Sequence, residues 1–338
     1  MGSFYQRRRE FLKVLGMGAG AVFFSGVRVC WAAAKDIFPA EKITWICYVK
    51  AGGGWDVVAR LLSPYFGKYI REAAKGAKGG EMTVKNVPAA GGQKAFSSIF
   101  HAKLDGYTIG DFNAAFATES IGGAKPDFDY TKYTFLVRTT ASTRVILARK
   151  NGLKSWDEMM KVGKEKELKL AASNFGRGHH VACILLKEIT KMPARLITFP
   201  GAAENLNALV RGDVQMAIAT TESIMGLVAA GEVKPLVVLS DTSPFPGVPT
   251  ISELGYPELA DPLKLHRFVV GPPNLPKQIC DTYTETFKRI FKDKDFLDSA
   301  KKVDFEPEPL YGADAERVAQ KFFAYYDEKA PILQKYLK

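Results

Sequence analysis

Hydrophobic positions along the chain follow two different spacings. Short runs rich in Val, Ile, Trp, Tyr and Phe predict strands, and longer stretches with an apolar residue every three or four positions predict helices. Strands are expected at residues 43–49, 82–87, 107–112, 135–139, 144–149, 168–172, 194–199, 214–219, 233–239 and 266–271. Helices are expected from residue 55 onward and at 91–102, 114–122, 156–163, 179–190, 203–210 and 221–230, with further helices filling the tail. This alternation is typical of an α/β protein with mostly parallel sheets, in which the strands at 135–139 and 144–149 are neighbours.

The length of the chain favours two domains. A loop dense in proline and glycine, residues 243–258, precedes the last strand, and the tail has too few strands to build a sheet of its own. We therefore expect the tail to return to the first domain. Lobe 1 would comprise residues 35–138 and 250–338 and lobe 2 residues 139–249, with crossings near 138–144 and 239–250. Solute receptors that close on a hinge are built in this way.

The first 34 residues predict an export signal. Arg8-Arg9-Glu10-Phe11-Leu12-Lys13 is typical of the twin-arginine route, and residues 14–27 are apolar but too short and too rich in glycine to span a membrane. Ala32-Ala33-Ala34 offers a cleavage site, whereas Cys30 stands in a poor context for lipid attachment. We expect a soluble protein of the bacterial periplasm that begins near Lys35.

The charge balance argues against a nucleic-acid partner. The chain has 47 Lys and Arg against 36 Asp and Glu, and without residues 1–34 the numbers fall to 42 and 35. This excess is modest and spread along helices, although its sign suits an anionic ligand. Beyond residue 34 the cysteines are Cys47, Cys183 and Cys280, and an odd number of them argues against a disulfide framework.

The stretch Tyr48-Val-Lys-Ala-Gly-Gly-Gly-Trp-Asp56 reads as the end of a strand, a glycine turn and the start of a helix. Consecutive glycines permit positive φ and let backbone N–H groups approach a ligand, and the helix N-terminus behind them carries partial positive charge. This geometry favours an anion. A dinucleotide fingerprint fails at Val57, and the Gly-Lys-Ser/Thr of a phosphate loop is absent. The alternative that the glycines only form a tight turn stays open.

Five segments carry a family pattern. They are Ala51-Gly-Gly-Gly-Trp-Asp-Val-Val-Ala-Arg60, Asn86-Val-Pro-Ala-Ala-Gly-Gly92, Asp105-Gly-Tyr-Thr108, Phe199-Pro-Gly-Ala202 with Leu209-Val-Arg-Gly-Asp-Val214, and Pro246-Gly-Val-Pro-Thr-Ile-Ser-Glu-Leu-Gly-Tyr256. In order and spacing they resemble the Bug family, the substrate-binding receptors of tripartite tricarboxylate transporters. The resemblance implies a type II-like periplasmic binding protein whose interlobe cleft captures a small organic carboxylate for membrane transporter subunits. It implies no catalysis and no cofactor, and we expect a monomer.

The resemblance also implies two loops that hold the anion. One runs from Ala51 through Asp56. The other reads Gly176-Arg-Gly-His-His-Val-Ala182, where His179 replaces the family's Ser or Thr and Ala182 its His; Phe199-Pro200-Gly201 likewise departs from the family's Tyr-Lys/Arg-Gly. The predicted binding residues are Tyr48, Ala51, Gly52, Gly53, Gly54, Trp55, Asp56, Asn113, Arg177, Gly178, His179, Gly201, Ala202 and Thr220.

Several of these residues also have ordinary structural interpretations. Asp56 lies where a carboxylate caps bare helix N–H groups, a role favoured over ligand contact, and it can pair with Arg60 one turn later. Arg177 or His179 would reach the ligand, since the Arg fork matches a carboxylate, but a solvated Arg177 is almost equally favoured. His179 and Cys183 share a helix face, yet no nearby carboxylate completes a metal site, so no metal is expected.

A catalytic site is not evident in the sequence. Gly-x-Ser-x-Gly is absent, and Cys183 beside His179 and His180 lies on an apolar helix face, where a thiol is usually inert. A carboxylate sensor for a signalling system and, less favoured, a hydrolase remain as alternatives to the transport receptor. Aromatic residues near the loop mouths either line the cleft, which would suit an aromatic or dicarboxylic ligand, or belong to the core; they are Tyr48, Trp55, Phe112, Phe116, Phe175 and Phe199.

Overall fold

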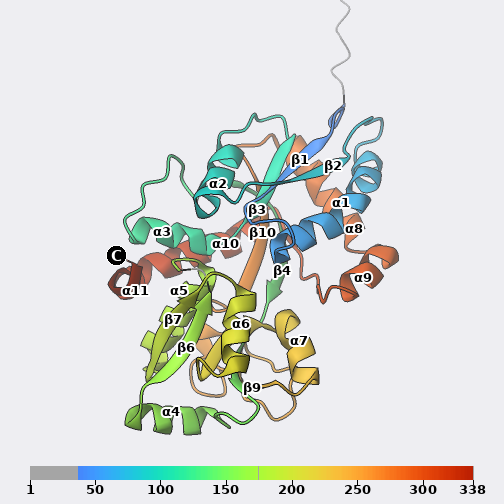
Figure 1. Ribbon diagram of the computed structural model, residues 1–338. Coiled ribbons are helices and arrows are strands. Elements are labelled where there is room, and N and C mark those ends of the chain that lie inside the picture. Colours follow the sequence, from blue (N-terminus) through green and yellow to red (C-terminus); the bar gives the residue numbers. More distant parts are fainter. Residues whose placement is uncertain (1–36, 174, 338) are drawn as a thin grey trace, which may run out of the picture. The chain divides into compact units, whose positions relative to one another are not determined.

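The computed structural model describes residues 37–173 and 175–337. The predicted signal segment lies outside these residues. The described strands form a six-stranded sheet in the order β11-β4-β10-β3-β1-β2 and a five-stranded sheet in the order β7-β6-β8-β5-β9 (Figure 1). Helices flank each sheet, which confirms a two-lobed α/β fold.

The first lobe is built on the six-stranded sheet. Its strands are β1 (Ile43–Cys47), β2 (Met82–Asn86), β3 (Thr108–Phe112), β4 (Thr134–Ser142), β10 (Leu265–Gly271) and β11 (Leu310–Tyr311). Its helices are α1 (Gly54–Ala73), η1 (Ala89–Gly92), α2 (Gln93–Phe100), η2 (Ala114–Ala117), α3 (Thr118–Ile121), α8 (Lys277–Ile290), α9 (Lys294–Lys301), α10 (Ala313–Glu328) and α11 (Ala330–Leu337). The tail therefore returns to this lobe through β10 and β11, as the sequence predicts.

The second lobe is built on the five-stranded sheet. Its strands are β5 (Arg144–Arg149), β6 (Leu168–Ser173), β7 (Ala194–Phe199), β8 (Met216–Thr220) and β9 (Val233–Leu239), and its helices are α4 (Trp156–Glu165), α5 (Gly178–Thr190), α6 (Ala202–Arg211), α7 (Thr221–Ala229) and η3 (Pro257–Leu259). Each strand expected from the hydrophobic pattern is present. The two-residue strand β11 is too short to give such a pattern.

The prediction of mostly parallel sheets is wrong, because both sheets are mixed. Parallel pairs join β1 to β2 and β3, and β6 to β7 and β8. Antiparallel pairs join the strands next to the crossings, which carry the chain out of a lobe and back into it. These pairs are β4 with β10 in the first sheet and β5 with β9 in the second. The cause is the double crossing, since two neighbouring strands that carry the chain in opposite directions between lobes must be antiparallel.

The first crossing lies within the expected residues 138–144, but the second lies beyond the expected 239–250. β4 stays in the first sheet through Ser142 and β5 enters the second at Arg144, so consecutive β4 and β5 belong to different sheets and are not neighbours. After β9 the chain stays on the second lobe, where Thr250 bridges Val238. It re-enters the first sheet only at Leu265, beyond the predicted boundary at 249. The proline-rich loop therefore covers the second lobe and is not the hinge.

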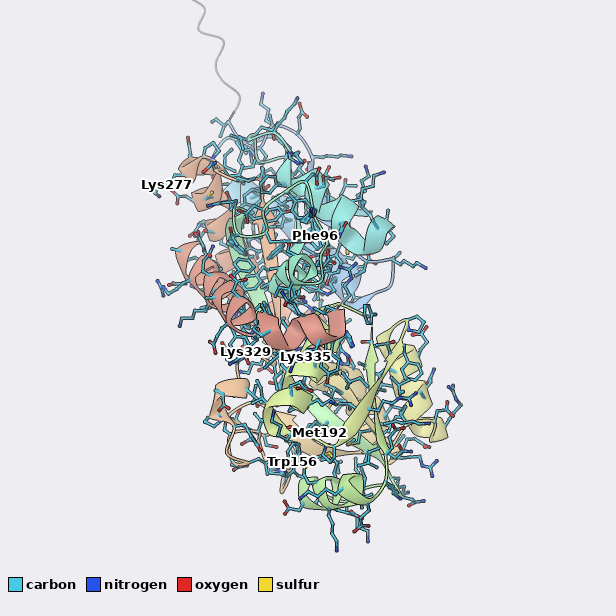
Figure 2. The ribbon with its side chains drawn as sticks, turned by 90° about the vertical axis from the view of Figure 1, so that its left-hand side faces the viewer. Phe96, Trp156, Met192, Lys277, Lys329 and Lys335 are labelled. Atoms are coloured by element: carbon cyan, nitrogen blue, oxygen red, sulfur yellow. The ribbon has the colours of Figure 1, made fainter. Side chains whose placement is uncertain are left out.

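Alternating side chains place separate hydrophobic clusters on the two faces of each sheet. In β5, Val145 packs with α6 and α7, whereas Ile146 faces the opposite cluster. That opposite cluster is shared between the lobes and includes Phe96, Trp156 and Met192 (Figure 2). The period of two along a strand explains this division. Among the described helices, none is both long and apolar enough to cross a membrane.

Asp111 is a carboxyl group inside the first sheet. It lies on β3, is 3% exposed, and its Oδ1 accepts a hydrogen bond of 3.0 Å from Nε1 of Trp45. Burial raises the pKa of Asp111 to about 7, against the lowering effects of Cys47, Trp45 and Arg267. Because the folded pKa exceeds the ordinary value near 4, this group contributes stability fully below about pH 4 and loses it as the pH rises through about 7.

Asp111→Asn should therefore remove a pH-dependent destabilisation. At pH 8 the variant should exceed the unmodified protein in unfolding free energy by on the order of 2 to 4 kcal/mol, and the two should be nearly equal at pH 4. Denaturant unfolding at a series of pH values measures this, with exposed Asp327→Asn as the control. A difference that stays constant from pH 4 to 8 would contradict it.

Candidate functional site

The turn between β1 and α1 is held by its own hydrogen bonds. Gly52 has φ +82°, and its N–H donates to Oδ2 of Asp56 at 2.8 Å. The N–H of Gly53 donates to the carbonyl of Lys50 at 3.2 Å. Gly53 itself has φ −71°, so only Gly52 in this turn uses the left-handed region expected of the glycines. Two of the three glycine N–H groups are thus already engaged.

Asp56 fastens this turn to the helix. It is 2% exposed, and Arg60 Nε and Asn86 Nδ2 donate to its Oδ1 at 3.0 and 2.8 Å. Burial would raise the pKa of Asp56, but the hydrogen bonds from Arg60, Gly52 and Asn86 outweigh it and lower the pKa. Both carboxylate oxygens are occupied. The i, i+4 pairing of Asp56 with Arg60 is confirmed, but Asp56 accepts from the N–H of Gly52 before the helix and not from a bare helix N–H as expected.

The first turn of α1 supplies the donors that remain. Gly53 precedes the helix in an extended conformation, and the first helical hydrogen bond runs from Val57 N–H to the Gly53 carbonyl. The N–H groups of Gly54, Trp55 and Asp56 lie before it, where a helix has no internal acceptors. These amides lie at the positive end of a 20-residue helix, a position that favours a negatively charged group.

Most of the aromatic residues near this turn are core residues. The Tyr48 ring lies 5.1 Å from Trp55, 5.0 Å from Phe116 and 5.3 Å from Phe96. Phe112 and Phe116 are buried, and Trp55 is 8% exposed. Phe175 is exposed in the second lobe, and Phe199 packs against the cluster beside α6. Tyr48 and Phe199 are the half-buried members of this set.

The second predicted loop uses its imidazoles to support the backbone. His179 Nδ1 accepts from Ser173 N–H at 3.0 Å, and His180 Nδ1 accepts from Gly176 N–H at 3.1 Å. Burial lowers the pKa of His179 to about 3 and that of His180 to about 4, so both rings are neutral. Burial raises the pKa of Cys183 to about 12, which makes it an inert core thiol. His179 positions the loop in place of a hydroxyl.

Arg177 reaches across to the first lobe. Its guanidinium pairs with Glu119 and lies 4.6 Å from the centre of the Phe116 ring. The Glu119 carboxylate is held in turn by Gln93 at 2.8 Å and Tyr130 at 2.9 Å. The interpretation of Arg177 as a merely solvated side chain is therefore wrong, because an interlobe ion pair holds it.

The start of α5 lies against the first lobe. The first helical hydrogen bond runs from Val181 N–H to the Arg177 carbonyl, leaving the earlier amides of the helix without internal acceptors. A side-chain carbon on Gly178 would lie 3.0 Å from both Asn113 Nδ2 and Ala115 Cβ. Glycine at 178 therefore allows this close approach, and Asn113 and Gly178 are brought together as predicted site residues.

The remaining predicted residues follow the same edge of the second sheet. β7, β6 and β8 are parallel, so their carboxyl ends lie on one side; Gly201 and Gly178 follow β7 and β6, and Thr220 is the last residue of β8. Thr220 is buried and its hydroxyl lies 2.8 Å from Ser223 Oγ. Gly201 lies beside Glu204 of α6, and Ala202 is exposed at the start of that helix. Ala51, in the turn between β1 and α1, is also exposed.

Sequence reasoning missed an arginine beside the α1 turn. Arg267 on β10 is 8% exposed; it donates to Ser142 Oγ at 2.9 Å and pairs with Glu222 of α7 at 3.4 Å. It lies 5.6 Å from the Trp55 ring, and a side-chain carbon on Gly54 would lie 3.6 Å from its Nη2. The signal was a charged residue inside a strand that is otherwise mostly apolar.

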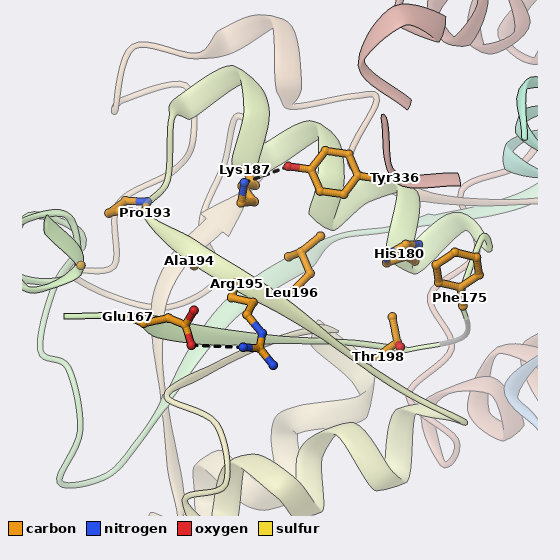
Figure 3. Close-up of a pocket in the computed structure, with 11 residues that line it drawn as sticks. Glu167, Phe175, His180, Lys187, Pro193, Ala194, Arg195, Leu196, Thr198 and Tyr336 are labelled. Carbon is orange, nitrogen blue, oxygen red and sulfur yellow. Dashed lines mark hydrogen bonds and ion pairs between the residues drawn. The ribbon is translucent and has the colours of Figure 1, made fainter. Parts of the chain in front are cut away.

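Two cavities lie away from the α1 turn. One of about 620 Å³ lies against β7 and α5 of the second lobe and Tyr336 of α11 (Figure 3). Its cations are already paired: Lys187 donates to Tyr336 OH at 2.8 Å, and Arg195 pairs with Glu167 at 3.5 Å. The other, of about 200 Å³, borders the Arg177–Glu119 pair. Neither is lined by the glycine turn. Within residues 37–173 and 175–337, no group of three His, Cys, Asp or Glu could hold a metal.

Comparison with known sequences gives consistent relatives. The model of the family described as tripartite tricarboxylate transporter family receptor matches residues 68–335. A protein of Agrobacterium vitis named "UPF0065 protein in the TAR-I ttuE-ttuC' intergenic region" is 22% identical over 339 residues, covering 98% of this chain and 94% of its own. Protein BugT of Bordetella pertussis is 25% identical over 246 residues, covering 70% of this chain and 73% of its own.

Solved structures share the fold. A TctC solute binding protein from Polaromonas has a TM-score of 0.71 at 18% identity, covering 88% of this chain and 99% of that one. The periplasmic binding protein BugD has a TM-score of 0.70 at 22% identity, covering 88% of this chain and 98% of that one. MatC of Rhodopseudomonas palustris with bound malate has a TM-score of 0.67 at 22% identity, covering 89% of this chain and 100% of that one. Because the family model matches residues 68–335, which are most of this chain, the chain belongs to the receptor family of tripartite tricarboxylate transporters.

Proposed function

We propose that this protein is a periplasmic receptor that captures a small organic carboxylate in a cleft between its lobes and delivers it to a tripartite tricarboxylate-type transporter. The observation that carries the proposal is the first turn of α1, whose free amides lie at the positive end of a long helix behind the Gly52 turn. The start of α5, which lies against Asn113 of the first lobe, provides a second set of amides. MatC, whose structure contains malate, supports a carboxylate as the ligand class.

The proposal includes export and processing. The twin-arginine pattern at Arg8 and Arg9 and the small residues at Ala32-Ala33-Ala34 would direct the chain to the periplasm and be removed near Ala34. These residues lie outside the described part of the structure. Mass spectrometry of the N-terminus of the exported protein tests this step, and a mature protein that retained Met1 would contradict it.

We further propose that the lobes move as two bodies. The first would comprise residues 37–142 and 265–337, and the second residues 144–264, since the sheets exchange the chain at Thr143 and just before Leu265. The ion pairs Arg177–Glu119 and Arg267–Glu222 would then form and break as the cleft closes and opens.

Binding is favoured over catalysis by the chemistry of the described residues. Cys183 is buried with a raised pKa, and His179 and His180 accept hydrogen bonds from the backbone, so neither ring is poised to activate a nucleophile. Asp56 is ionised and fully engaged. The family and fold are those of solute-binding proteins, and the site supports the same conclusion.

A carboxylate screen tests the proposed function. Malate, adipate, citrate and benzoate should each be added to the purified protein in a thermal-shift experiment, with glucose as a neutral control. At a hundred times its dissociation constant a true ligand should stabilise the folded state by about 2.7 kcal/mol. Stabilisation by glucose alone, or steady turnover of a carboxylate or ester, would count against a carboxylate receptor.

Gly52→Ala tests the role of the turn. A side chain at φ +82° strains the backbone by about 1 to 2 kcal/mol and should displace the amides behind it, so affinity for the carboxylate should fall about tenfold. Gly247→Ala is a matched control, because Gly247 has φ +74° in an exposed loop with open space around it. Calorimetry should show normal affinity for the control. Equal affinities for all three proteins would mean that the turn is purely structural.

A further inference from the structure

The hydrogen-bond donors of the Arg267 guanidinium are only partly satisfied by neighbouring residues. The residue is 8% exposed, and its Nε is buried without a hydrogen-bond partner among the described residues. Nη1 and Nη2 each lie 3.4 Å from the same Glu222 oxygen. Charged N–H···O hydrogen bonds are usually about 2.7–2.9 Å long, so this pair is loose. A buried guanidinium held this weakly is costly unless another acceptor completes it.

The groups around Arg267 indicate that its missing hydrogen-bond acceptor is an anion. Its Nη2 is aimed at the start of α1, where a side-chain carbon on Gly54 would lie only 3.6 Å away. The helix end and the guanidinium are both positive, so they repel each other unless a negative group lies between them. Glu222, which pairs with this guanidinium, comes from the other lobe, and the Asp111 carboxyl on β3, whose pKa Arg267 lowers, makes no hydrogen bond to it among the described residues. A carboxylate at this point would be bound by the helix amides and the arginine together.

Arg267 is also held in place for such a contact. Ser142 Oγ accepts from Nη1 at 2.9 Å, and the Trp55 ring lies 5.6 Å from the guanidinium carbon. These contacts fix the guanidinium against the first lobe, independently of Glu222. Of its two fixed neighbours, one is a neutral hydroxyl and the other an aromatic ring, so neither neutralises the charge. The guanidinium is therefore positioned before any ligand arrives.

We propose that Arg267 binds one carboxylate of the ligand directly, together with the first amides of α1, and that Glu222 occupies the guanidinium when no ligand is bound. This inference rests on the proposed function and names a specificity residue for it. The ligand carboxylate displaces Glu222 from Arg267 and leaves Glu222 at the rim of the site. Arginine thus adds a charged, two-pronged contact to a site otherwise built from backbone amides.

Variants of both partners test this assignment. Calorimetry should use whichever of malate, adipate, citrate and benzoate binds the unmodified protein most tightly. Arg267→Gln should weaken that binding about 10- to 100-fold, and Arg267→Lys, which keeps the charge but loses the fork, should weaken it by an intermediate factor. Glu222→Gln should strengthen binding several-fold, because the ligand no longer competes with an internal carboxylate.

Arg138→Gln is the matched control. Arg138 lies on the neighbouring strand β4 and donates to the carbonyl of Glu308, a contact that involves neither Glu222 nor the α1 turn. This variant should bind normally, and circular dichroism should show that all the variants fold. Normal binding by Arg267→Gln, or weaker binding by Glu222→Gln, would overturn the inference while leaving the receptor function intact. Failure of the unmodified protein to bind any of the four carboxylates would overturn both.

Discussion

The hydrogen bonds of one buried carboxylate determine where the candidate site lies. Asp56 accepts from Gly52 N–H, Arg60 and Asn86, and so ties the glycine turn to the helix behind it and to the neighbouring strand β2. The low pKa that results keeps it ionised, and its stabilising effect is present above the ordinary Asp pKa near 4 and is lost as the pH falls below it. Without this anchor, a turn of three glycines would have no fixed shape. With it, the amides of Gly54 and Trp55 are left pointing away from the protein's own acceptors.

The double crossing of the chain brings the second half of the site to this turn. β10 returns from the second lobe next to β3 and β4, and it carries Arg267 to the start of α1. α7, which follows β8 in the other sheet, brings Glu222 to the same guanidinium. A second interlobe contact, Arg177 with Glu119, lies beside Phe116. Charges from both lobes therefore meet at two interlobe ion pairs, which would have to break and form again if the lobes move as proposed.

Local sequence patterns predicted the elements well because helix and strand periodicity are local properties. The bounds expected for β9 and β7 agree with the structure, and the start of α1 and the pairing of Asp56 with Arg60 followed from capping and i, i+4 rules. Strand direction was not predictable in this way, since it depends on which strands carry the crossings. The boundary at Leu265 was missed because the proline-rich loop looked like a linker but packs on β9.

The candidate site was predicted only in part for the same reason. The glycine turn is contiguous in sequence, so its place between a strand and a helix could be predicted directly. Arg267 and Glu222 are far apart in the chain and meet only in the fold. His179 replaces a hydroxyl expected from the family pattern, but the structure gives it a backbone acceptor role that no spacing rule indicates.

The most direct test of this account is a crystal structure of the protein with its tightest-binding carboxylate. We expect one carboxylate within hydrogen-bonding distance of the Gly54 amide and the Arg267 guanidinium, with Glu222 moved away from the arginine. A ligand found instead in the second-lobe cavity beside Lys187 and Tyr336, with the Arg267–Glu222 pair unchanged, would contradict it.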